Sequence, residues 1–164
     1  MEISDSYIRI ALLEVREEKK EKITEIKALK ETPLKEGIVV NGEIKDKASF
    51  VKILGEFLKD IKPKIRYAVV SIPPNGIYSH LYSFPKTVSG EKLEETMNLT
   101  IGFQLPVKTE EVYLDWEKVS FAEKNEIFFA TAPKQIIDAY TEILTASGIG
   151  HIAVEFYPMS AVRA

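Results

Sequence analysis

The pattern of apolar and polar positions changes along the chain, and its first 45 residues show the period of strands. Apolar and polar residues alternate over Tyr7–Val15, the polar segment Lys19–Lys22 follows, and Ile23–Leu29 is apolar again. This pattern predicts two strands joined by a hairpin turn. Gly37–Ile44 predicts a third short strand, with a turn or bulge at Asn41-Gly42.

A helical period comes next. Asp46 can cap a helix that Pro63 ends, and the apolar residues between them recur every three or four positions: Phe50, Val51, Leu54, Phe57, Leu58 and Ile61. Tyr67–Ile72 is a continuous apolar run, which is typical of a strand buried on both faces. The predicted order is βββαβ, in which the helix crosses over to a parallel strand.

The segment that follows predicts a βαββα order. A tyrosine-rich strand, a helix that Ser89 can cap, a hairpin and a second helix follow one another over Ile77–Phe84, Ser89–Leu105, Val112–Val119, Glu126–Ala132 and Pro133–Gly148. Pro133 suits a first helical residue, and Gly148 suits a helix end.

The remaining residues return to the first pattern. Ile152–Val154 predicts a buried strand, and Pro158 opens a final helix that is still apolar at Ala164. The fold class is therefore α/β with an α+β insertion. We expect a sheet domain of residues 1–74 and 149–164, into which a module of residues 75–148 is inserted.

Composition narrows the functional classes. The net charge of −3 argues against non-specific nucleic-acid binding, which needs a basic surface. The chain has no cysteine, which excludes disulfides and a thiol nucleophile. No apolar run approaches the roughly 20 residues that span a bilayer. We therefore expect a cytoplasmic protein without direct membrane insertion, which reaches a membrane through partners.

An opening strand hairpin is followed along the chain by the stretches Gly37–Ile44, Val69–Pro73, Phe103–Pro106, Glu111–Trp116, Ala130–Lys134 and Ala153–Glu155. In this order, these segments resemble PilM-type actin-like proteins of type IV pilus assembly, distant relatives of the cell-division protein FtsA. The resemblance implies an actin-like (ribonuclease H-like) domain I. Residues 1–74 and 149–164 would form subdomain 1A, and residues 75–148 an inserted FtsA-type subdomain 1C.

The same resemblance bears on nucleotide chemistry. The intact family uses ATP and Mg²⁺ in a cleft between two domains, and domain II would begin after Ala164. We therefore expect no cofactor, no metal and no ATPase activity for this chain. Its one matching element is the first phosphate loop, at Glu2-Ile3-Ser4-Asp5-Ser6. Ser4 stands where the family has a glycine, and Asp5 adds negative charge. Either Ser4, Asp5 and Ser6 keep a weakened nucleotide contact, or the segment is a plain hairpin start.

The resemblance also implies a partner. PilM-like proteins bind the cytoplasmic N-terminal tail of a PilN-like inner-membrane protein, in a groove between the sheet domain and the module. We expect Pro74, Tyr78 and Gly148 near that groove. Tyr78 shares a strand face with Tyr82 and Phe84, which fits either core packing or peptide docking. Self-association is a further expectation.

Three functions remain open at this point. The first is an adaptor of type IV pilus assembly at the inner-membrane platform. The second is an actin-like ATPase whose nucleotide state regulates assembly. The third is a stand-alone α/β domain of unrelated function. His80 and His151 have no partners at catalytic or metal-binding spacing, so we expect no catalytic residue.

Overall fold

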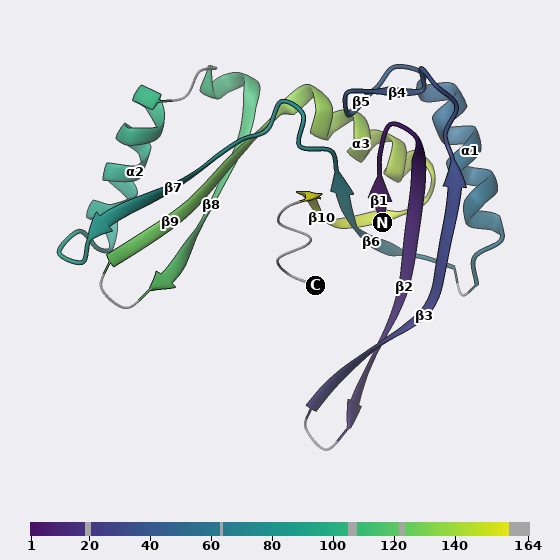
Figure 1. The fold of residues 1–164 in the computed structure, drawn as a ribbon, viewed down its shortest axis with the longest axis horizontal. Coiled ribbons are helices and arrows are strands. Elements are labelled where there is room, and N and C mark those ends of the chain that lie inside the picture. The colour runs from purple at the N-terminus through teal and green to yellow at the C-terminus, as the bar shows by residue number, and fades with distance from the viewer. Residues whose placement is uncertain (19–20, 63, 105–107, 122–123, 158–164) are drawn as a thin grey trace. The chain divides into compact units, whose positions relative to one another are not determined.

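The structure is a computed structural model that describes residues 1–18, 21–62, 64–104, 108–121 and 124–157. The chain forms two compact units (Figure 1). The sheet unit comprises Met1–Asn75 and Asp138–Ala164, and the inserted unit comprises Gly76–Ile137.

The sheet unit is built on a five-stranded sheet in the order β10-β6-β1-β2-β3. The strands are β1 (Glu2–Ile3), β2 (Tyr7–Glu18), β3 (Glu21–Pro33), β6 (Tyr67–Ile72) and β10 (Gly150–Phe156). β6 runs parallel to both β1 and β10, while β1, β2 and β3 are antiparallel neighbours. The predicted hairpin and the crossover to a parallel strand are confirmed.

Two helices belong wholly or mainly to this unit: α1 (Lys47–Lys59) and α3 (Lys134–Ala146). α1 begins as predicted, because the Asp46 carboxylate accepts a hydrogen bond of 3.0 Å from the Ser49 N–H. Phe50 and Leu54 of α1 are completely buried, as are Ile3 and Ile8 of the sheet. Ile3 and Thr32 both lie opposite Ile8 in the strand ladders, so these three residues share one face of the sheet. We call this face the helix side and the other face the open side.

The prediction that Gly37–Ile44 is one strand is wrong, whereas the turn predicted at Asn41-Gly42 is confirmed. These residues form a separate two-stranded ladder of β4 (Val39–Val40) and β5 (Glu43–Ile44). Asn41 and Gly42 have φ angles of 52° and 76°, the left-handed values of a tight hairpin turn, so the segment folds back on itself. The strand that completes the sheet is β1, which the periodicity analysis missed because two residues are too short to show a period.

β6 is not buried along both faces, contrary to the prediction. Val70 and Ile72 are almost fully buried, whereas Tyr67 and Val69 are 68% and 41% exposed. Tyr67 and Val69 share the open side with Ser71, which is paired with Glu2 and is buried. The open side of β6 is therefore exposed at Tyr67 and Val69 and buried only at Ser71.

The inserted unit is a three-stranded antiparallel sheet in the order β7-β9-β8 with one helix. Its elements are β7 (Tyr78–Pro85), α2 (Glu91–Gln104), the single-turn helix η1 (Thr109–Glu111), β8 (Val112–Phe121) and β9 (Lys124–Pro133). The predicted order of elements is confirmed. Its core comprises Tyr82, Leu93, Met97, Ile101, Ile127 and Phe129, with Tyr78, Phe84, Val88 and Trp116 packed against it.

The second boundary between the two units differs from the predicted one. The first division falls between Asn75 and Gly76, within one residue of the prediction. The second falls inside α3, after Ile137, so residues 138–148 belong to the sheet unit. The reason is that α3 buries Tyr140, and the Tyr140 hydroxyl donates a hydrogen bond of 2.9 Å to the Gly42 carbonyl, which lies in the sheet unit.

Gly148 ends α3 as predicted. Its φ is +76°, its N–H donates to the Thr145 carbonyl at 3.0 Å, and the Ile149 N–H donates to the Leu144 carbonyl at 2.9 Å. This pair of bonds is the Schellman arrangement, which glycine favours at a helix end. The predicted final helix from Pro158 lies outside the described residues.

Candidate functional site

The first candidate site is the turn between β1 and β2, which contains Ser4, Asp5 and Ser6. The Ser4 hydroxyl oxygen accepts hydrogen bonds from the N–H groups of Ser6 and Tyr7, at 3.3 and 3.1 Å. The Ser4 N–H and hydroxyl both point to the Tyr7 carbonyl, at 3.0 and 3.3 Å. The Ser4 side chain thus stabilises the turn, because it accepts hydrogen bonds from the Ser6 and Tyr7 N–H groups. A phosphate bound at this turn would need the same two donors.

Asp5 links this turn to the neighbouring turn at Asn41-Gly42. Its carboxylate oxygens accept hydrogen bonds from the N–H groups of Asn41 and Gly42, at 2.8 and 2.9 Å. Successive N–H groups around a left-handed turn form a concave nest that attracts anions. In this chain the nest is occupied by the protein's own carboxylate.

Two tyrosines, the buried Tyr140 and the half-buried Tyr157, donate hydrogen bonds to the backbone of these turns. The Tyr140 hydroxyl bonds the Gly42 carbonyl, and the Tyr157 hydroxyl donates to the Ile3 carbonyl at 2.7 Å. Burial raises the pKa of both phenols well above the usual range, with the neighbouring Tyr157 adding to the shift at Tyr140 and Glu2 adding to that at Tyr157. Both side chains therefore stay neutral and act as hydrogen-bond donors at physiological pH.

The arrangement of Ser4, Asp5 and Ser6 does not fit a nucleotide phosphate as it stands. The Ser6 and Tyr7 N–H groups donate to Ser4, and Asp5 in the same turn carries a carboxylate that repels an anion. Among the described residues, no group of three or more histidines, aspartates and glutamates is placed to hold a metal ion. The geometry favours the interpretation of a hairpin start fixed for structural reasons.

The three residues expected near a peptide groove lie in different places. Pro74 is exposed just after β6, and Gly148 is exposed just before β10. Because β6 and β10 are parallel and Tyr67 pairs with Gly150, Gly148 lies at the beginning of β6 and Pro74 beyond its end. The strand between them spans roughly 17 Å, at about 3.3 Å per residue. The structure therefore does not bring Pro74 and Gly148 together.

Tyr78 belongs to the inserted unit and is a core residue in part. It is half-buried and meets the Phe129 ring edge-on, with centroids 6.3 Å apart. Near it, the ends of the inserted unit meet: a β-carbon on Gly76 would lie 3.2 Å from Cγ of Pro133. The chain thus enters and leaves the inserted unit at one place, and Pro74 rather than Gly148 is next to it in the sequence.

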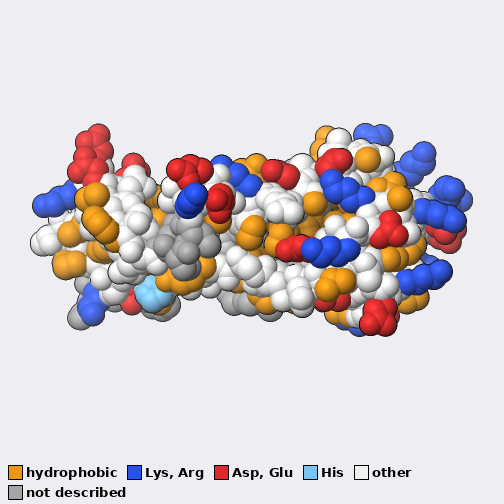
Figure 2. Space-filling model, turned by 90° about the horizontal axis from the view of Figure 1, so that it is seen from above, with side chains coloured by type: hydrophobic (Ala, Val, Ile, Leu, Met, Phe, Trp, Pro, Cys, Tyr) orange, Lys and Arg blue, Asp and Glu red, His pale blue; other side chains and the backbone are white. Residues whose placement is uncertain are grey.

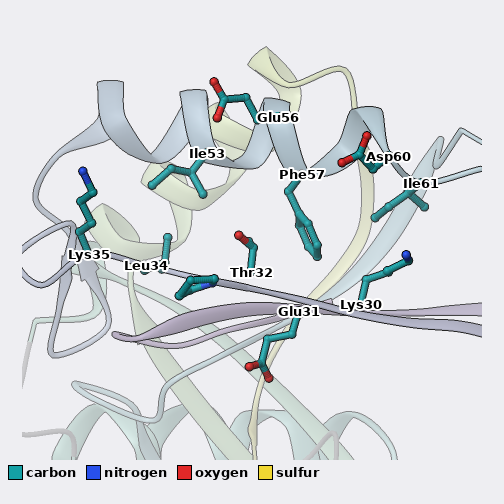
Figure 3. A pocket seen from close by; sticks show the side chains of 11 residues that line it. Lys30, Glu31, Thr32, Leu34, Lys35, Ile53, Glu56, Phe57, Asp60 and Ile61 are labelled. Carbon is teal, nitrogen blue, oxygen red and sulfur yellow. The ribbon is translucent and has the colours of Figure 1, made fainter.

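A feature that the sequence analysis missed is a groove between β3 and α1, shown in Figure 3. It encloses about 600 Å³. Lys30 and Thr32 of β3 point toward α1, from which Ile53 and Phe57 reach down, while Glu31 points to the other face of the strand (Figure 3). Glu56 of α1 and Asp60, which follows the last residue of α1, also line it. Periodicity cannot reveal such a groove, because it depends on how far a helix stands from an edge strand.

Charge is distributed without a single-sign patch on the face seen in Figure 2. Basic and acidic side chains are interspersed there, with apolar patches between them. This distribution agrees with the net charge of −3 and favours protein partners over nucleic acid. No helix in the described part of the chain has the length and apolar character needed to cross a membrane.

Comparison with solved structures identifies the class of fold. The chain matches a protein of a PilM-PilN type IV pilus biogenesis complex with a TM-score of 0.78 at 21% sequence identity, over 99% of this chain and 48% of that one. It also matches the cytoplasmic domain of EpsL, an inner-membrane component of the type II secretion system of Vibrio cholerae. That match has a TM-score of 0.54 at 15% identity, over 94% of this chain and 55% of that one. The fold is therefore the actin-like α/β fold.

The family follows from the sequence as a whole. The family model of the type IV pilus assembly protein PilM matches residues 1–164, and the chain belongs to that family. It spans about half the length of the solved structures it matches. A comparison with curated proteins gave no match.

Proposed function

We propose that this chain is the domain I portion of a PilM-type adaptor in type IV pilus assembly, and that it binds the N-terminal tail of a PilN-like inner-membrane protein. The observation that carries the proposal is the match of the family model to all 164 residues. The likeness to a chain of a PilM-PilN complex supports it at the level of fold. Such a protein would be cytoplasmic and would lie at the inner membrane only through its partner.

The test is a calorimetric titration of the chain with a peptide that copies the tail of the PilN-like protein from the same organism. We expect saturable binding. Pro74→Glu, at the exposed junction, should weaken binding at least about tenfold, because a charge there must be desolvated when a peptide covers it. Ala146→Glu is the matched control, since it is exposed near Gly148 at the far end of β6 and should leave affinity unchanged.

The results separate cleanly. Absence of heat at high peptide concentration would contradict binding by this portion of the protein. Binding that is weakened by Ala146→Glu but not by Pro74→Glu would place the site at the other end of the sheet. Equal loss with both variants, together with a lowered melting temperature, would indicate damage to the fold rather than to the site.

We further propose that the chain has no ATPase activity and binds Mg·ATP no more tightly than about 1 mM, an affinity of roughly −4 kcal/mol. The support is the closure of the β1–β2 turn on Ser4 and Asp5. Phosphate release and fluorescent-nucleotide titration of purified residues 1–164 test this. Turnover that depends on Mg²⁺ would contradict it.

A further inference from the structure

β3 is an edge strand with an apolar surface that the described residues do not cover. Within the described sheet it has one neighbour, β2, so its outer edge presents backbone groups without a ladder partner there. Ile23, Ile26 and Leu29 of β3 are 41%, 63% and 71% exposed. Long edges of this kind are sites at which another strand can pair.

A β-bulge in β3 determines which residues share a face. Leu12 is opposite Ala28 and Leu13 is opposite Ile26, so Lys27 is the extra residue. Lys27 forms ion pairs with Glu14 and with Glu25, which lie on the helix side, and Lys27 is therefore on that side together with Ala28. From the ladder register, the helix side of β3 carries Ile23, Glu25, Lys27, Ala28, Lys30 and Thr32, and the open side carries Thr24, Ile26, Leu29 and Glu31.

This distribution makes the strand complementary to itself. We propose that two copies of the chain pair through antiparallel β3 strands, about a two-fold axis between Lys27 and Ala28. The axis sets Ile26 of one copy opposite Leu29 of the second copy on the open side. It sets Glu25 opposite Lys30 on the helix side. Symmetry repeats each of these pairs, giving two apolar pairs and two pairs of opposite charge.

The bulge is what makes this register possible. Directly opposed residues of antiparallel strands point to the same face, so a regular strand cannot place a two-fold axis between adjacent residues. Moving the axis onto Lys27 would set Ile26 opposite Ala28, and moving it onto Ala28 would set Lys27 opposite Leu29. Both choices join residues of different faces. The axis between Lys27 and Ala28 keeps the faces matched on both sides of the bulge.

The same register fills the groove between β3 and α1. It places Ile23 of the second copy opposite Thr32, on the helix side, where Ile53 and Phe57 line the groove. Ile23 is exposed in the single chain, and Thr32 lines the groove in Figure 3. Pairing thus brings an exposed apolar side chain toward the part of the groove that Ile53 and Phe57 line, in each half of the dimer.

Charge reversal tests the register by sedimentation equilibrium of residues 1–164. Glu25→Lys or Lys30→Glu alone creates two like-charge pairs per dimer, and each should raise the dimer dissociation constant by about tenfold. The double variant, Glu25→Lys with Lys30→Glu, restores opposite charges and should return to within about threefold of the original value. A chain that stays monomeric up to about 0.5 mM, or a dimer indifferent to both single reversals, would overturn the proposal.

Disulfide trapping provides a test that does not depend on affinity, because the chain has no cysteine. Opposed residues of antiparallel strands have Cα atoms about 4.5–5.5 Å apart, within the range for a disulfide. Mixing Ile26→Cys with Leu29→Cys should therefore yield a cross-linked dimer on oxidation. Val15→Cys on β2 mixed with Leu29→Cys is the control and should yield none. Equal yields from the two mixtures would contradict the register.

This inference is independent of the PilN-like partner. Dimer variants at Glu25 and Lys30 should keep the affinity for the tail peptide, because β1 and β2 lie between β3 and β6, the strand that Pro74 follows. Loss of the dimer with intact peptide binding would therefore support the pairing through β3, and the peptide titration alone decides the adaptor function.

Discussion

At the scale of single residues, Asp5 and Ser4 decide the character of the β1–β2 turn. The Ser4 hydroxyl oxygen accepts hydrogen bonds from two backbone N–H groups, and the two carboxylate oxygens of Asp5 accept one each. Sequence reasoning found these positions through the resemblance, and it noted the loss of glycine at Ser4 and the added charge at Asp5. It could not find that Asp5 reaches Asn41 and Gly42, because that contact joins segments 36 residues apart.

Replacing Asp5 tests whether its role is structural. Asp5→Ala should lower the free energy of unfolding by about 1 kcal/mol, since two backbone donors lose a charged acceptor at a position that water can reach. Asp5→Asn keeps one acceptor oxygen and should lose about half as much. Urea denaturation followed by circular dichroism measures both. If Asp5→Ala were as stable as the original chain, the hydrogen bonds from the Asn41-Gly42 turn to Asp5 would contribute nothing to the free energy of unfolding.

Two glycines with the same backbone angle form a matched pair. Gly42 and Gly148 both have φ of +76°, but a β-carbon on Gly42 would lie 3.3 Å from Cβ of Pro73, whereas at Gly148 the described residues place no such atom within 4 Å. Gly148→Ala should cost about 1 kcal/mol through backbone strain alone. Gly42→Ala should cost more, because steric crowding adds to the same strain. Equal losses in chemical denaturation would show that Pro73 moves aside freely.

At the scale of elements, the prediction succeeded wherever one local signal was sufficient. Asp46 caps α1 and Gly148 ends α3, because capping depends on residues a few positions away. It failed where a contact with another element decides the outcome. Gly37–Ile44 resembles a strand, yet it forms a ladder of its own. The apolar run of β6 indicates two buried faces, yet burial depends on what covers each face.

The cap of α1 provides a prediction about pH. Hydrogen bonds from the side chain and backbone of Ser49 lower the pKa of Asp46 below its ordinary value of 3.8. A carboxylate whose folded-state pKa is depressed stabilises the fold above its unfolded pKa, and this contribution disappears as pH falls through the folded value. Asp46→Asn keeps a good cap without the titrating group. The difference in melting temperature between the two proteins should therefore change between pH 5 and pH 2.

The neutral pH range serves as the control for this measurement. Between pH 6 and pH 8 the Asp46 carboxylate is ionised in both folded and unfolded chains, so the difference in melting temperature should be constant there. A difference that drifts across the neutral range would point to another titrating group.

At the scale of the whole molecule, two units with separate cores share one helix. The inserted unit has its own cluster around Met97 and Phe129. α3 begins in that unit and ends in the sheet unit, which the boundary predicted at 148 did not capture. The apolar stripe of α3 is unbroken across Ile137 and Asp138, so the sequence alone gives no sign of the division.

Excision tests this boundary. Deleting residues 77–132 joins Gly76 to Pro133, which already lie in contact, and should leave a sheet unit that melts cooperatively. Deleting residues 75–148 also removes the buried Tyr140, Ile143 and Leu144. Because losing one large core side chain costs about 2–5 kcal/mol, the second variant should not fold. Cooperative melting of both variants, measured by calorimetry, would contradict the assignment of α3 to the sheet unit.

The pairing of β6 with β10 has a consequence for synthesis on the ribosome. Tyr67 can pair with Gly150 only after residue 150 has been synthesised. The whole inserted unit is translated between these two residues. The inserted unit pairs its strands over shorter separations and can complete its core first, since domains tend to fold as they emerge. Until β10 has been synthesised, the edge of β6 that pairs with β10 has no partner strand. A nascent chain stalled before residue 150 should therefore expose that edge to chaperones and proteases.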